Sequence, residues 1–393
     1  MKRIFAVLLT VAMTLTLVAC GGNSSGNKVI KIGVFEPQSG DNGAAGKQEI
    51  LGIEYAHSLV PTVDINGETY DVELVIVDNQ STTDKATSAA QELVGKGVSV
   101  VLGSYGSGAS IAGGPVFQSA KIPAIGCSCT NPSVTVGNPY YYRVCYTDPF
   151  QGTVMANFAK DEFSAQKVYV LTQLGDDYSA GLSNYFIEAF EAMGGECVQE
   201  NFPEGSSDFS AYITNATNSG ADVIFAPVSL AYVPLVIQQV DASGTKMPVL
   251  AGDTFDHSLV LEAQNGTGIP IYCSTFFDES DEGSVAAEFV TGFKAWLNEN
   301  EDKKTNNGGN DIIAACSALA YDSYMVAIEA IKAAGSTSGE DIQAALANVD
   351  MDAVTGHITF NEEGDANKDM AYIKQANDGV YTFVKIQTVA DMG

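Results

Sequence analysis

The sequence is poor in basic residues and in histidine. Its 393 residues include 19 lysines and arginines, 48 aspartates and glutamates and 3 histidines, which gives a formal net charge of −29 at pH 7. Because nucleic-acid binding depends on basic patches that meet phosphates, we expect no nucleic-acid partner. His57, His257 and His357 show no metal-ligand spacing. We therefore expect neither a metal site nor a cofactor.

Complete catalytic motifs are also missing. Gly46-Lys47-Gln48 resembles part of a phosphate-binding loop, but Asp41 stands where the loop needs its first glycine, and no hydroxyl residue follows Lys47. Gly126-Cys127-Ser128-Cys129-Thr130 resembles a nucleophile elbow that lacks its second glycine. We expect that the protein is not an enzyme.

A long apolar run occurs only at the N-terminus. Lys2 and Arg3 precede an apolar stretch over residues 4–18, which is too short to span a membrane and is typical of a secretory signal. Leu17-Val18-Ala19-Cys20-Gly21 resembles a bacterial lipobox. The sequence thus predicts a signal peptide over residues 1–19, lipidation of Cys20 and a flexible tether over residues 20–27. Such a protein is exported and lipid-anchored to the outer face of the cytoplasmic membrane, or to the periplasmic side of a bacterial membrane.

Six cysteines remain after Cys20. Exported proteins can pair such residues, and the sequence leaves open whether any of these do. We expect a free or partly free set that is buried as small apolar residues. Cys127 and Cys129 alternate with Ser128, so they should point away from the face that carries this serine.

Strand-like and helix-like patterns alternate along most of the chain, which predicts parallel sheets flanked by helices. Two successive series suggest two lobes. The polar stretch at residues 300–310 is expected to be a surface loop. The predicted strands lie at residues 30–35, 72–78, 98–102, 122–126, 168–171, 222–228 and 248–251, with antiparallel strands at 357–360, 370–376 and 381–387. The predicted helices lie at residues 47–59, 84–96, 180–193, 209–218, 233–242, 284–298 and 312–334.

Residues 98–132 carry the pattern of half a ligand site. A buried strand ends at Gly103, and a glycine-serine turn then delivers Ser107 to the start of a short helix. The next buried strand is followed by Ser128 and Thr130. Because the carboxyl ends of parallel strands share one edge of a sheet, we expect these hydroxyls near Ser107, beside free amides that suit a carboxylate.

The chain resembles the substrate-binding proteins of ABC transporters for branched-chain (Leu/Ile/Val-type) and related amino acids. The resemblance covers residue 28 to about residue 387 and implies the type I periplasmic-binding fold. This fold has two doubly wound α/β lobes, a hinge of three crossovers and a ligand cleft between the lobes. The order and spacing of the following segments carry the resemblance: residues 32–40, 103–110, 124–132, 250–253, 319–322 and 354–360.

The resemblance also implies how the chain divides into lobes. The first lobe is expected to comprise residues 28–146 and 275–355. The second is expected to comprise residues 147–274 and 356–393.

In this family the first lobe holds the α-carboxylate and α-ammonium of an amino acid, which the resemblance assigns here to Ser107, Ser128 and Thr130. The second lobe supplies a tyrosine and an acid, matched by Tyr178 and Asp253. The family often has glutamate at the acid position. Since aspartate is one methylene shorter, the ammonium would have to lie closer or be bridged by water.

The side-chain pocket departs from the family pattern. Ala45 stands where branched-chain binders have an aromatic residue, and Ser229 replaces a tyrosine of the second lobe. Phe255, Phe276 and Phe277 are candidates for a new apolar wall, although each is equally suited to a core position.

The resemblance implies a monomeric lipoprotein that captures an amino acid and delivers it to an ABC permease. Two alternatives stay open at this point. The protein could be a ligand-sensing receptor of the same fold, or the importer could take a polar amino acid or a small amide.

Overall fold

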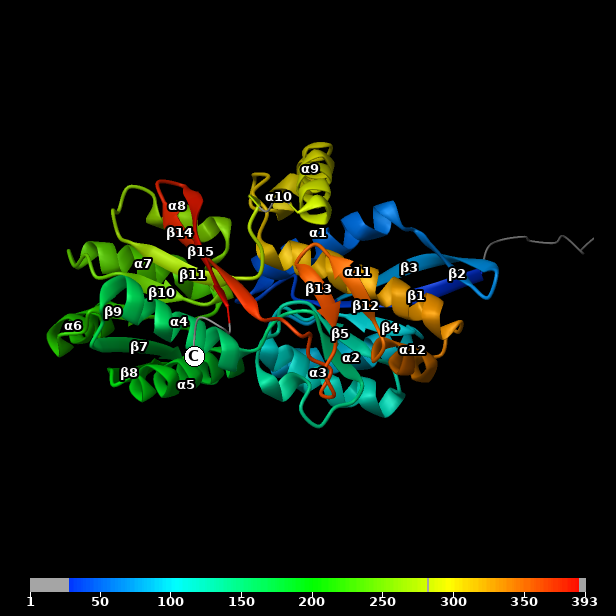
Figure 1. Ribbon diagram of the computed structural model, residues 1–393, viewed down its shortest axis with the longest axis horizontal. Helices are drawn as coiled ribbons and strands as arrows, with labels where there is room; N and C mark the ends of the chain where they lie inside the picture. The colour runs from blue at the N-terminus through cyan, green and yellow to red at the C-terminus, as the bar shows by residue number, and fades with distance from the viewer. Residues whose placement is uncertain (1–27, 281–282, 389–393) are drawn as a thin grey trace, which may run out of the picture.

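The computed structural model describes residues 28–280 and 283–388, which form two α/β lobes side by side (Figure 1). The first lobe contains a six-stranded sheet in the order β2-β3-β1-β4-β5-β6. All neighbours in this sheet are parallel except β2, which is antiparallel to β3. The strands are β1 (Lys28–Glu36), β2 (Thr62–Ile65), β3 (Glu68–Asp78), β4 (Val100–Leu102), β5 (Ala124–Gly126) and β6 (Tyr141–Arg143).

Helices cover both faces of this sheet, which explains the continuous apolar runs of its central strands. α1 packs against α11 on one face, and α2 packs against α3 on the other. The α1–α11 contact is close, since a Cβ built on Gly52 would lie 2.1 Å from the Ser317 carbonyl oxygen. The helices are α1 (Gly43–Leu59), α2 (Thr83–Gly95), α3 (Ser107–Ala120), α9 (Ser284–Asn298), α10 (Glu301–Asn306), α11 (Ala315–Ala334) and α12 (Gly339–Leu346).

The second lobe contains a seven-stranded sheet in the order β15-β14-β11-β10-β9-β7-β8. β14 is antiparallel to both of its neighbours, and the rest of the sheet is parallel. The strands are β7 (Lys167–Gln173), β8 (Glu196–Phe202), β9 (Val223–Phe225), β10 (Val249–Ala251), β11 (Ile271–Thr275), β14 (Met370–Asn377) and β15 (Val380–Thr388). The helices are α4 (Asp148–Phe163), α5 (Asp177–Ala192), α6 (Ser210–Ser219), α7 (Val233–Ala242) and α8 (Ser258–Gln264), with 3-10 turns η2 (Leu230–Tyr232) and η3 (Asp253–Phe255). A further 3-10 turn, η1 (Pro132–Val134), belongs to the first lobe.

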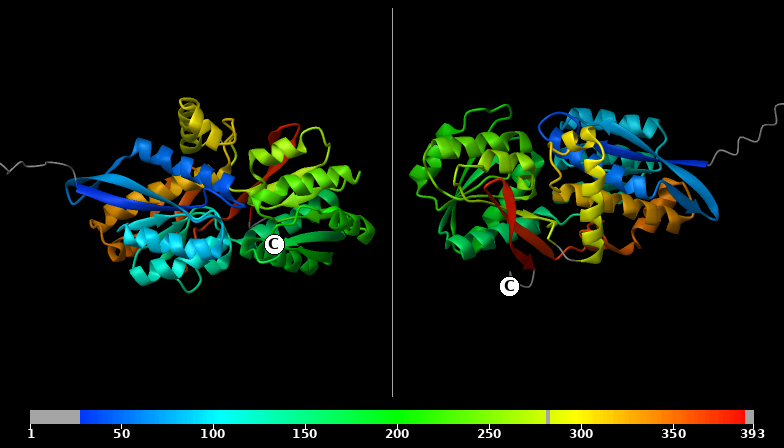
Figure 2. Two further views of the ribbon diagram at one scale, coloured as in Figure 1. Left: turned by 180° about the vertical axis from the view of Figure 1, so that it is seen from behind. Right: turned by 90° about the horizontal axis from the view of Figure 1, so that it is seen from above.

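The chain passes between the lobes three times, and the views from behind and from above show two bodies joined by these passages (Figure 2). The passages follow β6, β11 and the small hairpin of β12 (Asp350–Ala353) and β13 (Gly356–Thr359). The segment after β13 still lies along β6, because Arg143 pairs with Asp365 and the Tyr142 and Phe360 rings are 5.2 Å apart. The third passage therefore begins after Ala366, and we propose to move the lobe boundary from residue 355 to this point.

Most predicted elements are present, and the differences have local causes. Residues 300–310 contain α10 instead of a continuous loop, because the Asn300 side chain caps the amides of Asp302 and Lys303. The prediction also missed α4, as well as the β2–β3 hairpin. This hairpin turns at Asn66-Gly67 with positive φ at both residues, the geometry that an Asn-Gly pair favours.

The cysteines of the described residues are unpaired. Cys127, Cys129, Cys145, Cys273 and Cys316 are buried and Cys197 is partly buried, whereas Cys20 lies outside the described residues. Within residues 28–280 and 283–388, we find no helix with the length and apolar character needed to cross a membrane.

Candidate functional site

A small cavity lies between the lobes. Its walls come from loops that follow the carboxyl ends of β4, β5, β7, β9 and β10 and from the loop before α1, as expected for open α/β sheets. We call this space the ligand cavity. Its lining residues are Asn42, Tyr105, Gly106, Ser107 and Ser128 from the first lobe and Asp176, Tyr178, Ser229, Asp253 and Thr254 from the second.

The cavity brings together residues that the sequence predicted from distant segments. Ser107, Ser128, Tyr178 and Asp253 all line it. Thr130 is fully buried just behind the wall, beside the carboxyl group of Asp148. Burial raises the pKa of Asp148 to about 8. Thr130 does not line the cavity, and we assign it to support of the wall from behind.

Two buried carboxyl groups underlie the wall of the first lobe. Glu49 accepts a hydrogen bond from the Ser128 hydroxyl, and Glu36 accepts one from the Tyr105 amide at 2.8 Å. Burial raises the pKa of Glu49 to about 7, while burial and the neighbouring Glu49 hold the pKa of Glu36 well above its usual range. Near neutral pH the pair therefore retains a proton. Because the Ser128 hydroxyl donates its hydrogen bond to Glu49, its oxygen remains free to accept a hydrogen bond from a ligand.

The same carboxyl groups are the candidates for a metal site in the described part of the chain. Ligand atoms of Glu36, Glu49 and Cys127 lie within 4.8 Å of one another. The three side chains are fully buried, and burial raises the pKa of the Cys127 thiol well above its usual range, which disfavours the thiolate that a metal requires. We interpret the cluster as a protonated carboxyl pair.

Asp253 is the acid of the second wall. Its Oδ1 atom accepts hydrogen bonds from Gln151 Nε2 at 2.9 Å and from the Tyr178 hydroxyl at 3.1 Å. Burial raises the pKa of this carboxyl to about 6, although both bonds lower it. Near pH 7 Asp253 is therefore an anion that faces the ligand cavity and lacks a cationic partner among the residues that line it.

Gly252 makes this arrangement possible. A Cβ built at this position would lie 2.4 Å from the Tyr178 hydroxyl oxygen and 2.9 Å from Gln151 Nε2. Any side chain here would push both donors away from Asp253.

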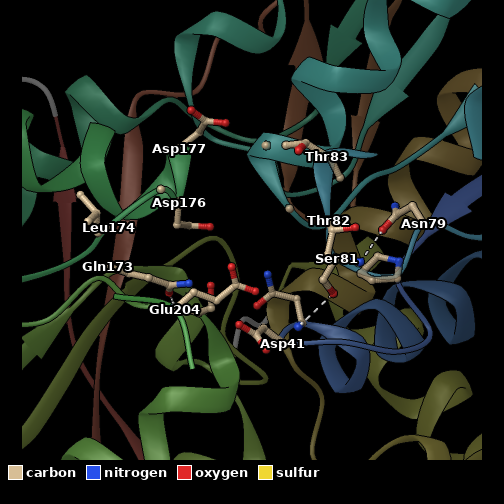
Figure 3. Close-up of a pocket in the computed structure, with 17 residues that line it drawn as sticks. Asp41, Asn79, Ser81, Thr82, Thr83, Gln173, Leu174, Asp176, Asp177 and Glu204 are labelled. Carbon is tan, nitrogen blue, oxygen red and sulfur yellow. Dashed lines mark hydrogen bonds between the residues drawn. The ribbon is translucent and has the colours of Figure 1, made fainter. Parts of the chain in front are cut away.

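The mouth of the cleft is strongly acidic. A hollow opens beside the ligand cavity, and it shares Asn42, Gly106, Asp176 and Ser229 with that cavity. Figure 3 shows Asp41, Asp176 and Glu204 around this opening, and neither lysine nor arginine is among its 17 described lining residues. Burial raises the pKa of Asp176 to about 6. The mouth thus favours ligands that carry a positive group.

A second, small inner cavity shares Tyr105 and Asp253 with the ligand cavity. Two of the predicted pocket residues, Ala45 and Phe276, line it, whereas Ser229 lines the ligand cavity itself. Phe255 lines neither space. It is fully buried in the apolar core of the second lobe, so we assign it to packing. Phe277 is also buried, against Phe289.

The lobes touch across the mouth. The Asn42 side-chain oxygen accepts a bond from the Leu230 amide at 3.2 Å, and the Asp41 carbonyl accepts one from the Ala231 amide at 3.0 Å. Asn131 Nδ2 donates to the Asp177 carbonyl at 2.8 Å. These bonds join different lobes, so the structure represents a closed form of the cleft.

Fold and site together define a two-lobed binding protein that closes around a small molecule. The chain belongs to the periplasmic binding protein family, whose model matches residues 29–379. It is similar to the leucine-binding protein LivK of Thermotoga maritima, with 32% identity, a TM-score of 0.84 and coverage of 92% of this chain and 100% of the other. It is also similar to LivJ of Streptococcus pneumoniae in complex with isoleucine, with 28% identity, a TM-score of 0.80 and coverage of 92% and 99%.

A curated relative extends the comparison along the sequence. The Leu/Ile/Val-binding protein homolog 1 of Brucella abortus is 26% identical over 377 residues, which cover 94% of this chain and 96% of the relative. The chain is thus a substrate-binding protein of the ABC transporter type.

Sequence reasoning missed the groups that support the cavity wall. Glu36, Glu49, Gln151 and Asp148 are all fully buried. A signal was present for Glu36, which ends an apolar strand, and for Glu49, which lies within a stretch of α1 that is otherwise largely apolar. A buried acid at such a position usually has a specific partner.

Proposed function

We propose that the protein captures an amino acid in the ligand cavity and delivers it to the permease of an ABC importer. The observation that carries this proposal is that the start of α3 and the anionic Asp253 lie on opposite walls of one small cavity. The two walls suit the two opposite charges of a zwitterion. The leucine, isoleucine and valine named for the relatives support an amino acid as the ligand class.

The carboxylate of the ligand would bind at the start of α3. The first amides of this helix have no acceptor within the helix, and they carry the positive end of its dipole. Ser107 is the first residue of the helix and lines the cavity, so its hydroxyl can join these amides. Thr130, behind the wall, would hold the adjoining loop.

The ammonium would bind between Ser128 and Asp253. The Ser128 oxygen is available as an acceptor because its proton is directed to Glu49. Asp253 supplies the opposite charge, and Tyr178 orients it. Because Asp253 belongs to the second lobe, the full set of contacts forms only when the lobes close, and closure is what the ligand stabilises.

Binding, closure and release are the whole activity that we propose, without a chemical step. We further propose that the protein is exported as a monomer and anchored through lipidated Cys20. A Cys20→Ala variant in the native host should then leave the membrane fraction or remain unprocessed. Wild-type protein found wholly in the soluble fraction would contradict the anchor.

A calorimetric titration of the purified protein with each proteinogenic amino acid tests the proposed ligand class. We expect saturable 1:1 binding of at least one of them and a rise of the melting temperature with its concentration, since the ligand binds only the folded state. If none of the amino acids binds, the proposal is wrong.

A further inference from the structure

The inner cavity is the space into which a ligand side chain would extend. It lies directly behind Asp253 and Tyr105, the two residues it shares with the ligand cavity. Much of its wall is apolar, through Ala45, Phe276 and Ala315. Besides Asp253 and Tyr105, three polar side chains line it, namely Asp256, His257 and Thr275.

Two of these polar residues are fully engaged with protein groups. Asp256 Oδ2 accepts bonds from Thr275 Oγ1 at 2.7 Å and from the Ala315 amide at 3.3 Å, and it pairs with Lys374 at 3.2 Å. The Thr275 proton is directed to this carboxylate. Neither residue has an evident need for a ligand contact.

His257 is different, because one of its ring nitrogens has a partner and the other does not. The side chain is only 5% exposed. Nδ1 accepts a hydrogen bond from the Leu259 amide at 3.1 Å and so caps α8. An accepting Nδ1 carries no proton, so the proton of the neutral ring sits on Nε2. Burial lowers the pKa of His257 to about 4, which keeps the ring neutral near pH 7.

His257 lines the inner cavity, and its protonated Nε2 is a buried donor. Within residues 28–280 and 283–388, this atom has no hydrogen-bond partner. Leaving a buried donor unsatisfied is costly, and an aliphatic ligand side chain in this space would leave it so. A ligand that places an oxygen here would satisfy it.

We propose that His257 is a specificity residue whose Nε2–H group donates to an oxygen on the ligand side chain. The ligand is then an amino acid with a short, uncharged polar side chain that bears an amide or a hydroxyl group. A carboxylate side chain is disfavoured because Asp253 and Asp256 border the same space. This inference rests on the proposed capture of an amino acid.

Matched variants of His257 separate the donor from the helix cap. Asparagine places its amide oxygen near the position of Nδ1, so His257→Asn keeps the cap but removes the donor. Glutamine places its amide nitrogen near the position of Nε2, so His257→Gln keeps a donor and weakens the cap. Melting temperatures of the ligand-free variants show that each is folded.

Two pairs of nearly isosteric ligands report on the donor: asparagine with leucine, and threonine with valine. We expect His257→Asn to weaken binding of the polar member of a pair by about tenfold to a hundredfold, while the aliphatic member changes by less than about threefold. His257→Gln should keep most of the preference. Calorimetry gives the dissociation constant of each amino acid.

The outcomes distinguish a failure of the assignment to His257 from a failure of the proposed function. If amino acids bind but His257→Asn shifts the affinities of polar and aliphatic members equally, the assignment to His257 is overturned while the proposed function stands. If no amino acid binds the wild type, the proposed function fails first, and the inference falls with it.

Discussion

At the scale of single residues, the site depends on acids that are partly or fully buried without a cation. Asp253 is the clearest case, since the donors to its carboxylate among residues 28–280 and 283–388 are the neutral Gln151 and Tyr178. Such a carboxylate is unfavourable in the empty protein and becomes favourable once an ammonium arrives. Loss of the Asp253 charge should therefore weaken ligand binding, whereas the stability of the ligand-free protein should not fall.

Asp253→Asn tests this opposition. Loss of the charge should weaken amino acid binding by about 30-fold to several thousand-fold, which corresponds to about 2–5 kcal/mol. At pH 8 the ligand-free variant should be at least as stable as the wild type, because a buried anion is removed. Calorimetry and urea unfolding measure the two effects. Unchanged affinity in a folded variant would refute the assigned role.

The pH dependence of binding follows from the same residue. The pKa of Asp253 is raised to about 6 in the ligand-free fold, so the carboxyl is protonated below this pH and cannot pair with an ammonium. Affinity should therefore fall by up to about tenfold for each pH unit below about 6. Binding near pH 6 should release protons, detectable by calorimetry in buffers of different ionisation enthalpy. If Asp253→Asn releases as many protons on binding as the wild type does, groups other than Asp253 cause the pH dependence.

At the scale of elements, short loops after the strands place the side chains, and buried groups hold these loops. Gly252 lets η3 approach α5 closely. Arg143, fully buried at the end of β6, donates to the carbonyls of Cys129 and Asn131 and so clamps the residues on either side of Thr130. Neither Gly252 nor Arg143 lines the ligand cavity, so we assign both to positioning.

Gly252→Ala should weaken binding by about tenfold or more, because the added methyl group displaces the two donors that orient Asp253. The matched control is Gly95→Ala at the end of α2, where a Cβ meets no atom within 4 Å. This control should keep wild-type affinity and be neutral or slightly stabilised. Equal affinities for both variants would contradict the proposed geometry.

Arg143→Met should destabilise the protein by about 3–5 kcal/mol, because Asp365 and two buried carbonyls lose their partner. Urea unfolding of the ligand-free protein measures the loss. Lys121→Met is the surface control, since its pair with Glu340 is exposed and should contribute little to the stability. A similar small effect for both variants would show that Arg143 does not hold the loop.

At the scale of the whole molecule, the ligand and the contacts across the mouth stabilise the same closed form. Asn131 binds the Asp177 carbonyl of the other lobe through Nδ2 while its Oδ1 accepts from the Ser133 amide. The lobes are otherwise linked mainly by three passages of chain, which permits them to move apart. Closure is then set by a few bonds in addition to the ligand.

Asn131→Asp separates these two bonds, since the carboxylate still caps η1 but can no longer donate to Asp177. We expect about tenfold weaker binding, mainly through faster dissociation, with little change in the stability of the ligand-free protein. Stopped-flow fluorescence and thermal unfolding provide these measurements. A slower dissociation would contradict a role of Asn131 in holding the lobes closed.

The sequence alone determined the class of fold and predicted several residues that line the cavity. Alternating apolar patterns depend on near neighbours in the chain, so they predict the strands and helices of both lobes. Ser107 and Ser128 were predicted to be neighbours because the ends of parallel strands meet at one edge of a sheet. The match to the family then identified Tyr178 and Asp253 on the opposite lobe, and all four line the cavity.

Only the tertiary structure decided which groups lie behind the cavity wall and which line it. Glu36 and Glu49 meet because α1 packs on the sheet, and Gln151 reaches Asp253 because α4 crosses beneath β10 and β11. Packing also places Phe255 in the core and Phe276 at the inner cavity. It leaves Nε2 of His257 without a partner among the described residues. These contacts join residues far apart in the chain, and burial then sets their pKa values, so no local pattern contains them.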